Sequence, residues 1–173
     1  MTDFEYLGIN HLALVCEDMD RTMDFYVNVL GMPLTKTIEL PNGRGKHYFF
    51  DCGGGDQLAF FWFPNGPEAV EAKEYRRITA TPGTMNHVAF NVAPEKIDTY
   101  QAKLAELGIE VTEVVNHDDS ETGVSEEISP STFVRSIYFK DPDGTQLEFA
   151  AWARPLTEAD VVYPAAESAN GSP

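Results

Sequence analysis

The chain repeats itself about half-way along, and this duplication limits the folds that it can adopt. Residues 9–14 read INHLAL and residues 85–90 read MNHVAF, so both segments carry Asn-His, an apolar residue, alanine and another apolar residue. His11 and His87 lie 76 positions apart. A repeat of this kind reflects a repeated structural unit, so we expect two similar modules in one chain.

The first module is predicted to run strand, helix, strand, strand, strand. Asp18 or Asp20 is a good N-cap for its helix, and Gly31 follows the last helical residue. The expected elements are a strand at 9–16, a helix at 18–30 and strands at 34–40, 47–52 and 57–63.

The second module repeats this order. Pro94 stands where its helix begins and Gly108 where it ends. The acidic segment 116–130 has no counterpart in the first module and is predicted to be a surface loop or lid, with His117 solvated. The expected elements are a strand at 85–92, a helix at 94–107 and strands at 109–115, 134–139 and 146–150.

Together these modules predict one domain over 1–173, of the α+β class. Its expected parts are module 1 at about 7–64, a linker at 65–83 with a short helix around 68–75, module 2 at about 84–151 and a tail at 152–173. The tail has little apolar periodicity, and we expect it to be partly disordered.

Composition excludes several classes of function. The chain has 12 basic and 28 acidic residues and a formal net charge of −16, which argues against binding to nucleic acid. With Cys16 and Cys52 as its only cysteines it has no disulfide framework, and we expect both to be inert thiols. The first residues lack a signal-peptide pattern and no apolar run approaches a membrane span, so we expect a cytoplasmic protein that does not bind membranes.

Alternation along the strands predicts which side chains point away from the helices. In the first strand Leu12 and Leu14 share the face that packs under the helix, which leaves His11 on the other. The same argument turns His87 and Glu148 away from the helix side. A carboxylate inside an apolar strand is costly to bury without a partner. We therefore expect these two histidines and the glutamate to meet at one point and bind a metal ion.

Aromatic side chains are expected to line the cavity around that ion. Aligning Gly55 with Gly144 pairs Phe49 with Tyr138, and Ala59 falls where the second module has Glu148. The duplication thus offers three ligands and not four. The other residues predicted to face inward are His47, Gln57, Phe61, Phe63 and Ser136.

The repeated unit, the two Asn-His pairs and the segment from Asp141-Pro142-Asp143-Gly144 to Glu148 resemble the vicinal oxygen chelate superfamily, which includes glyoxalases, bleomycin resistance proteins and extradiol dioxygenases. The resemblance covers about residues 7–151. It implies paired βαβββ modules that form a curved mixed sheet around a metal cavity, with His11, His87 and Glu148 as ligands. It also implies a homodimer.

Two imidazoles and one carboxylate are the ligand set of non-haem iron(II) oxygenases. Within the superfamily this set is similar to that of extradiol ring-cleaving dioxygenases, which implies Fe(II), with Mn, Zn or Ni as alternatives, and an aromatic diol or similar small molecule as substrate. Residues 138–148 match the second half of the dioxygenase signature, whose first half has a histidine several residues before the tyrosine. Residues 129–132 read SPST instead. His47 is the expected acid–base group, and Tyr138 is expected to orient the substrate anion.

Two other functions fit the same residues. A glyoxalase-type lyase or isomerase would use Zn, Ni or Mn, although such enzymes usually take a fourth ligand from the first module, where Ala59 stands. A fosfomycin-resistance thiol transferase uses three ligands but needs cationic residues to hold a phosphonate. A binding protein of the bleomycin-resistance kind would sequester a flat ligand without metal, and such proteins typically lack the ligand triad.

Overall fold

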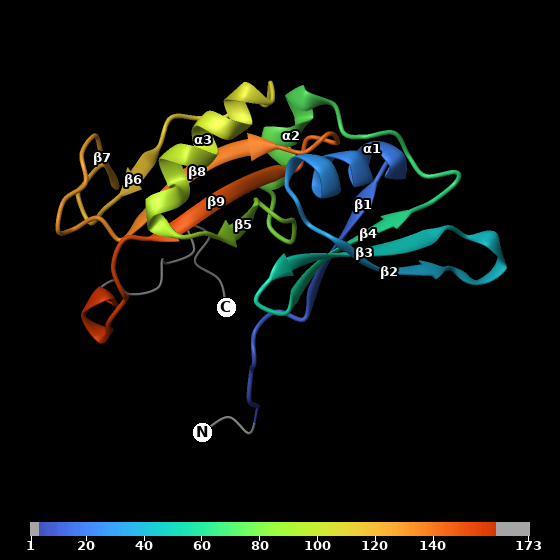
Figure 1. Ribbon diagram of the computed structural model, residues 1–173, viewed down its shortest axis with the longest axis horizontal. Helices are drawn as coiled ribbons and strands as arrows, with labels where there is room; N and C mark the ends of the chain where they lie inside the picture. Colours follow the sequence, from blue (N-terminus) through green and yellow to red (C-terminus); the bar gives the residue numbers. More distant parts are fainter. Residues whose placement is uncertain (1–3, 162–173) are drawn as a thin grey trace, which may run out of the picture.

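The computed structural model describes residues 4–161 and arranges the two modules as two separate mixed sheets that lie side by side (Figure 1). Sheet A has the strand order β1-β4-β3-β2, and sheet B has the order β5-β9-β8-β6-β7. In each sheet the first strand is parallel to its neighbour and the other pairings are antiparallel. The α+β class is confirmed, but within 4–161 the modules do not share one continuous sheet.

Module 1 follows the predicted order of elements. They are β1 (His11–Cys16), α1 (Met19–Met23), the π-helical turn η1 (Asp24–Val29), β2 (Leu34–Glu39), the 3-10 turn η2 (Pro41–Gly43), β3 (Lys46–Gly53) and β4 (Asp56–Trp62). The predicted helix is present as α1 and η1 together. It begins at Asp18, whose side chain accepts a hydrogen bond from the Arg21 N–H, and Gly31 follows it at φ +75°.

Module 2 comes after a linker helix. The linker contains α2 (Ala72–Thr79), and module 2 contains β5 (Val88–Asn91), η3 (Pro94–Lys96), α3 (Ile97–Glu106), β6 (Val115–His117), β7 (Val124–Ser125), β8 (Val134–Lys140) and β9 (Gln146–Trp152), followed by η4 (Glu158–Asp160). Helix α2 begins later than the sequence suggested. Its Tyr75 hydroxyl accepts a hydrogen bond from the Gln146 N–H at 2.8 Å, which ties this helix to the start of β9. Most of the tail that we expected to be disordered, 162–173, lies outside the described residues.

The predicted strand at 109–115 is wrong. Residues 109–114 run beside β8 without a regular ladder, and strand pairing begins only at Val115. The Thr112 N–H donates to the Tyr138 carbonyl, but the Tyr138 N–H donates to the Thr112 side-chain hydroxyl instead of to a carbonyl, each at 3.0 Å. A side chain has thus replaced a backbone acceptor, which interrupts the ladder. The acidic segment beyond it folds into the β6–β7 hairpin.

Helices α1, α2 and α3 lie on one side of the two sheets, and none of these three covers the other side (Figure 1). The predicted alternation is confirmed, because Leu12 and Leu14 pack against the core while His11 and Ala13 are exposed. The core lies under the helices. Its largest fully buried apolar or aromatic side chains are Tyr26, Phe50, Leu58, Phe60, Ile97, Ile137, Phe139 and Leu147.

The Asp-Pro-Asp-Gly turn joins the two modules. Asp141 is buried and accepts hydrogen bonds from the N–H groups of Asp143 and Thr145. Its other oxygen accepts from the hydroxyl of Tyr26 in module 1 at 3.1 Å. Burial raises the pKa of Asp141, and the three hydrogen bonds satisfy its oxygens. This part of the dioxygenase-like signature therefore has a structural role.

Among residues 4–161, no helix is both long and apolar enough to cross a membrane.

Candidate metal site

Both Asn-His pairs adopt the same local structure. The side-chain oxygen of Asn10 lies 2.7 Å from Nδ1 of His11, and that of Asn86 lies 2.6 Å from Nδ1 of His87. An amide oxygen can only accept a hydrogen bond, so Nδ1 carries the proton and Nε2 keeps a free lone pair. Histidines that bind metals are commonly fixed in this way by a partner on the second ring nitrogen. The duplication thus leaves Nε2 of each imidazole available to a metal ion.

Glu148 lies beside the second of these histidines. Its Oε2 is 2.8 Å from Nε2 of His87, and the glutamate is only 5 % exposed. β5 and β9 bring them together, because Ala89, two positions after His87, pairs with Glu148. A neutral His87 with its proton on Nδ1 turns a lone pair toward the carboxylate, so the two groups need a cation between them, either a second proton or a metal ion.

The spacing of this pair fits a metal ion. Two ligands that bind one ion in adjacent positions at about 2.1 Å each are about 3 Å apart. The 2.8 Å between His87 Nε2 and Glu148 Oε2 is close to that value, and it is also the length of a charge-assisted N–H···O hydrogen bond. The donors also match, because an imidazole nitrogen and a carboxylate oxygen are ligands for Zn, Mn and Fe(II).

His11 does not join them. It lies on β1, at the edge of sheet A, where its ring centroid is 5.6 Å from Phe49 and 6.4 Å from His47. Within the part of the chain that the structure describes, no three His, Cys, Asp or Glu side chains are grouped so that they could hold one ion. The expected meeting of all three ligands is therefore not seen in a single chain. The reason is that the two sheets lie side by side and their helix-free faces do not face one another (Figure 1).

Sheet A supplies an aromatic surface around His11. The His47 ring stacks on Phe61 with centroids 3.7 Å apart and planes 9° apart, and Phe61 is parallel to Phe63 at 5.9 Å. His47 is buried, and its Nε2 has no hydrogen-bond partner. Burial, and then the charge of His11, lower the pKa of His47, so it is a neutral imidazole near pH 7. An unpaired, buried nitrogen beside a candidate ligand is a group that a substrate could satisfy.

Sheet B supplies a phenol next to Glu148. Tyr138 on β8 stands directly opposite Glu148 on β9. Burial, and then the negative charge of Glu148, raise the pKa of Tyr138, so the phenol keeps its proton and remains a hydrogen-bond donor.

His117 is not solvated as the sequence suggested. It is half-buried on β6, and its Nε2 lies 3.2 Å from the Tyr138 hydroxyl. No motif indicated this contact, because the segment looked like an acidic loop. Only the pairing of β6 with β8 brings the two side chains together.

The remaining inward-facing residues offer no further ligand or nucleophile. Gln57 is held by a 2.7 Å hydrogen bond from the Thr35 hydroxyl, and Ala59 is fully buried. Burial raises the pKa of the Cys16 thiol to about 11 and also raises that of Cys52. Both thiols are therefore protonated and unreactive near neutral pH, as expected.

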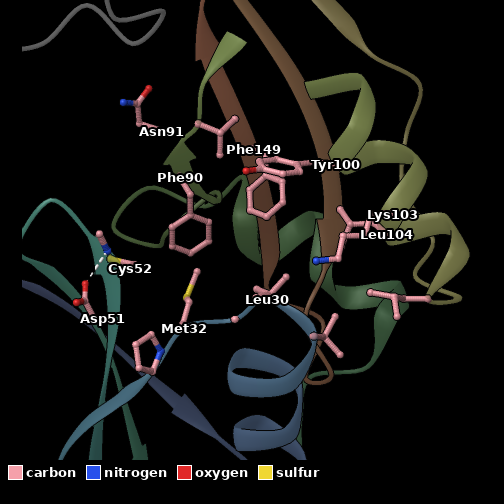
Figure 2. Close-up of a pocket in the computed structure, with 16 residues that line it drawn as sticks. Leu30, Met32, Asp51, Cys52, Phe90, Asn91, Tyr100, Lys103, Leu104 and Phe149 are labelled. Atoms are coloured by element: carbon pink, nitrogen blue, oxygen red, sulfur yellow. Dashed lines mark hydrogen bonds between the residues drawn. The ribbon is translucent and has the colours of Figure 1, made fainter. Parts of the chain in front are cut away.

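A cavity of about 440 Å³ lies elsewhere, at the junction of the two modules (Figure 2). Met32 and Leu30 approach it from module 1, and Phe90, Tyr100 and Phe149 from module 2. These side chains belong to the helix side of sheet B or to the end of η1, and none of the candidate ligands lines the cavity. The sequence did not indicate this cavity, because it depends on how the modules dock.

Comparison with known proteins shows which family the chain belongs to. The model of the glyoxalase/bleomycin resistance protein/dioxygenase superfamily matches residues 8–149, which is most of the chain. The chain belongs to this superfamily. The match includes both Asn-His pairs and Glu148, so the resemblance noted from the sequence is confirmed at the level of the superfamily.

Two of the relatives of this superfamily member carry the names of different enzymes. It is 28 % identical to the metallothiol transferase FosB of Shouchella clausii over 82 % of this chain and 77 % of that protein. It is 29 % identical to glyoxylase I 4 of Arabidopsis thaliana over 82 % of this chain and 68 % of that protein. Neither of these two relatives is named as a dioxygenase.

Solved structures share the fold. A glyoxalase family protein from Enterococcus faecalis has a TM-score of 0.60 at 24 % identity and covers 84 % of this chain and 98 % of its own. FosX from Listeria monocytogenes, crystallised with Mn(II) and sulfate, has a TM-score of 0.55 at 21 % identity and covers 85 % and 93 %. At these identities the likeness concerns the fold alone. It includes a protein whose structure holds a divalent metal.

Proposed function

We propose that this protein is a metal-dependent enzyme of the glyoxalase type, a lyase or isomerase that binds a small substrate through neighbouring oxygen atoms. One observation carries the proposal. Asn10 and Asn86 hold the Nδ1 atoms of His11 and His87 in the same way, and Glu148 lies 2.8 Å from Nε2 of His87. His11, His87 and Glu148 would hold the ion, which would act as a Lewis acid on the substrate oxygens. The glyoxalase and metallothiol transferase relatives support this class more than a dioxygenase.

The protein side chains have distinct roles in this reaction. Tyr138 donates a hydrogen bond to the anionic oxygen of the substrate, which suits a phenol that stays protonated beside Glu148. His47 is neutral near pH 7 and its buried Nε2 is free, so it accepts the substrate proton and returns it to the neighbouring carbon. The stacked rings of His47, Phe61 and Phe63 exclude water from one side of the substrate.

The site requires a second copy of the chain. His11 on sheet A and the His87–Glu148 pair on sheet B each form an incomplete half-site on a face without a helix. These two faces also expose large apolar side chains: Val15 is 57 % exposed and Trp152 is 51 % exposed. A twofold homodimer in which sheet A of one protomer covers sheet B of its partner buries both patches and completes two sites.

Mixing two inactive variants tests this arrangement. His11→Ala and Glu148→Ala should each lose the metal as homodimers. If the site lies between protomers, a heterodimer of the two variants has one intact site, and random exchange restores about a quarter of the wild-type sites. Co-expression with two different affinity tags isolates the heterodimer for metal quantification. A heterodimer without metal, or a wild type that sediments as a monomer, would contradict the shared site.

The reaction itself is tested by separate assays of the wild type. Purified protein loaded with Zn, Ni, Mn or Fe(II) is given the hemithioacetal of methylglyoxal with a small thiol, and product formation is followed together with dissolved oxygen. We expect turnover without oxygen uptake. The same hemithioacetal left unchanged with all four metals would overturn the glyoxalase assignment.

A second candidate is an Fe(II) extradiol dioxygenase acting on an aromatic diol. The aromatic surface of His47, Phe61 and Phe63 favours a planar substrate. Oxygen uptake and yellow ring-cleavage products from catechols with Fe(II) would support this candidate against the first. The FosB reaction would need a cation to hold a phosphonate: Arg135 is engaged with Asp98 and Arg154 with Asp160, whereas Arg44 lines a pocket together with Phe61 and Phe63.

A further inference from the structure

His117 and Tyr138 contact each other although their backbones are far apart in the register of sheet B. His117 on β6 pairs with Val134 on β8, and Tyr138 lies four residues further along that strand. Four residues of a strand cover about 13 Å, yet His117 Nε2 and the Tyr138 hydroxyl are 3.2 Å apart. The two side chains therefore lean toward each other along the strand, across the position of Ser136.

Ser136 stands between Val134 and Tyr138 on the same face of β8. Ser136 is fully buried, and its hydroxyl has no hydrogen-bond partner within residues 4–161. Leaving a buried hydroxyl unpaired costs stability. The Nε2 of His117 is at hydrogen-bond distance from the Tyr138 hydroxyl.

The chemistry of a phenol explains what such a contact can do. A tyrosine hydroxyl has one proton to donate and lone pairs that accept. If His117 donates its Nε2–H to the hydroxyl oxygen, the tyrosine proton is free to point at another acceptor. Hydrogen bonds in such a chain polarise one another, so the phenol also becomes a better donor.

We propose that His117 is a positioning residue that donates to Tyr138 and so directs the phenol proton toward the anionic oxygen of a substrate beside Glu148. This inference rests on the proposed function, because it assigns the direction of a hydrogen bond within the same site. The acidic segment 116–130, absent from module 1, thus supplies a histidine to the tyrosine. It does so although residues 129–132, where the dioxygenase signature has its histidine, contain none.

The first test uses the metal-loaded homodimer and 4-nitrocatechol, whose two neighbouring oxygens chelate the ion and whose absorbance reports binding. The His117→Leu variant should bind the probe about three- to tenfold more weakly, as expected for one lost hydrogen bond, with unchanged metal content. The His117→Gln variant keeps an N–H donor and should recover most of the affinity. Glu121→Gln in the same segment is the matched control and should bind like the wild type.

A double-mutant cycle separates positioning from a structural effect. If His117 acts through the phenol, His117→Leu should weaken probe binding in the wild type but change it less than twofold in a Tyr138→Phe background. The same fold-loss in both backgrounds would overturn the proposal.

A direct measurement checks the contact itself in metal-free protein. The ¹⁵N chemical shifts of the His117 ring should correspond to a proton on Nε2, and they should change in Tyr138→Phe. Unchanged ring shifts would overturn the proposal. A wild type that takes up neither metal nor probe would overturn the proposed function and this role with it, whereas normal binding by His117→Leu overturns the role of His117 alone.

Discussion

The two modules have the same backbone pairing but different chemistry at equivalent positions. In module 1, Phe49 pairs with Ala59, and in module 2, Tyr138 pairs with Glu148 in the same register. The Asn-His hydrogen bond is present in both modules. Duplication has thus kept the imidazoles and their partners, while only the second module has a carboxylate and a phenol. The comparison teaches that one half of the chain supplies an apolar surface and the other supplies charge.

The same comparison explains the two buried side-chain atoms without partners in residues 4–161, His47 Nε2 and Ser136 Oγ. His47 pairs with Phe61 and Ser136 pairs with Ala150, so they occupy equivalent positions of the duplicated sheet. A buried polar atom without a partner lowers stability, and its occurrence at both positions suggests a common reason. Only His47 has a role in the proposed reaction, as its acid–base group.

The largest effect is expected from making module 1 resemble module 2. Ala59→Glu places a carboxylate at a fully buried position opposite Phe49. Without metal this charge has no counterion, so unfolding by urea should show a loss of about 3 kcal/mol or more. Ala102→Glu, at an exposed position of α3, is the control and should change stability by less than about 0.5 kcal/mol. Equal stability of both variants would contradict the difference between the modules.

A second prediction concerns the asparagines. Asn10→Ala and Asn86→Ala should each lower metal affinity about 10- to 100-fold, because each asparagine fixes the ring of one ligand. Competition with a chromogenic chelator measures the metal affinity of each variant. A loss with Asn86→Ala alone would show that only the second histidine binds the ion, and the shared site would have to be abandoned.

A smaller effect is expected at the unpaired hydroxyl. Ser136→Ala removes a buried polar atom without a partner, so it should stabilise the protein by about 1 kcal/mol, or about 2–4 °C in Tm. The same variant should bind 4-nitrocatechol no more tightly than the wild type. A loss of stability would mean that the hydroxyl has a partner after all.

The smallest effect is the pH dependence that His47 adds to module 1. Burial lowers its pKa in the folded protein below the value of 6.5 for an unperturbed histidine. As the pH falls, the unfolded chain therefore takes up this proton first. The contribution of His47 to stability is full above pH 6.5 and is lost as the pH falls toward the pKa in the folded state. Between pH 7 and pH 5 the free energy of unfolding of metal-free His47→Phe should fall less than that of the metal-free wild type. Urea unfolding at both pH values measures this, and an equal fall for both proteins would contradict the prediction.

Local patterns predicted most of the fold. Alternation placed β1, β3, β4, β8 and β9, and the caps at Asp18 and Gly31 placed the first helix. The strand expected at 109–115 failed because the Thr112 side chain competes for the Tyr138 N–H, and a hydrophobic pattern does not reveal such competition. The half-burial of His117 was missed for a related reason, since the polar neighbours of this residue conceal a strand that forms only against β8.

The sequence by itself determined the duplicated order of elements, the face on which His11, His87 and Glu148 stand and the Asn-His pairs, because these depend on contacts between near neighbours and on the period of two in a strand. Only the tertiary structure decided which of these groups meet. It brings Glu148 to His87 through the pairing of β5 with β9, brings His117 to Tyr138 through β6 and β8, and leaves His11 on a separate sheet. The distance between two sheets depends on how whole modules dock, which no local pattern in the sequence records.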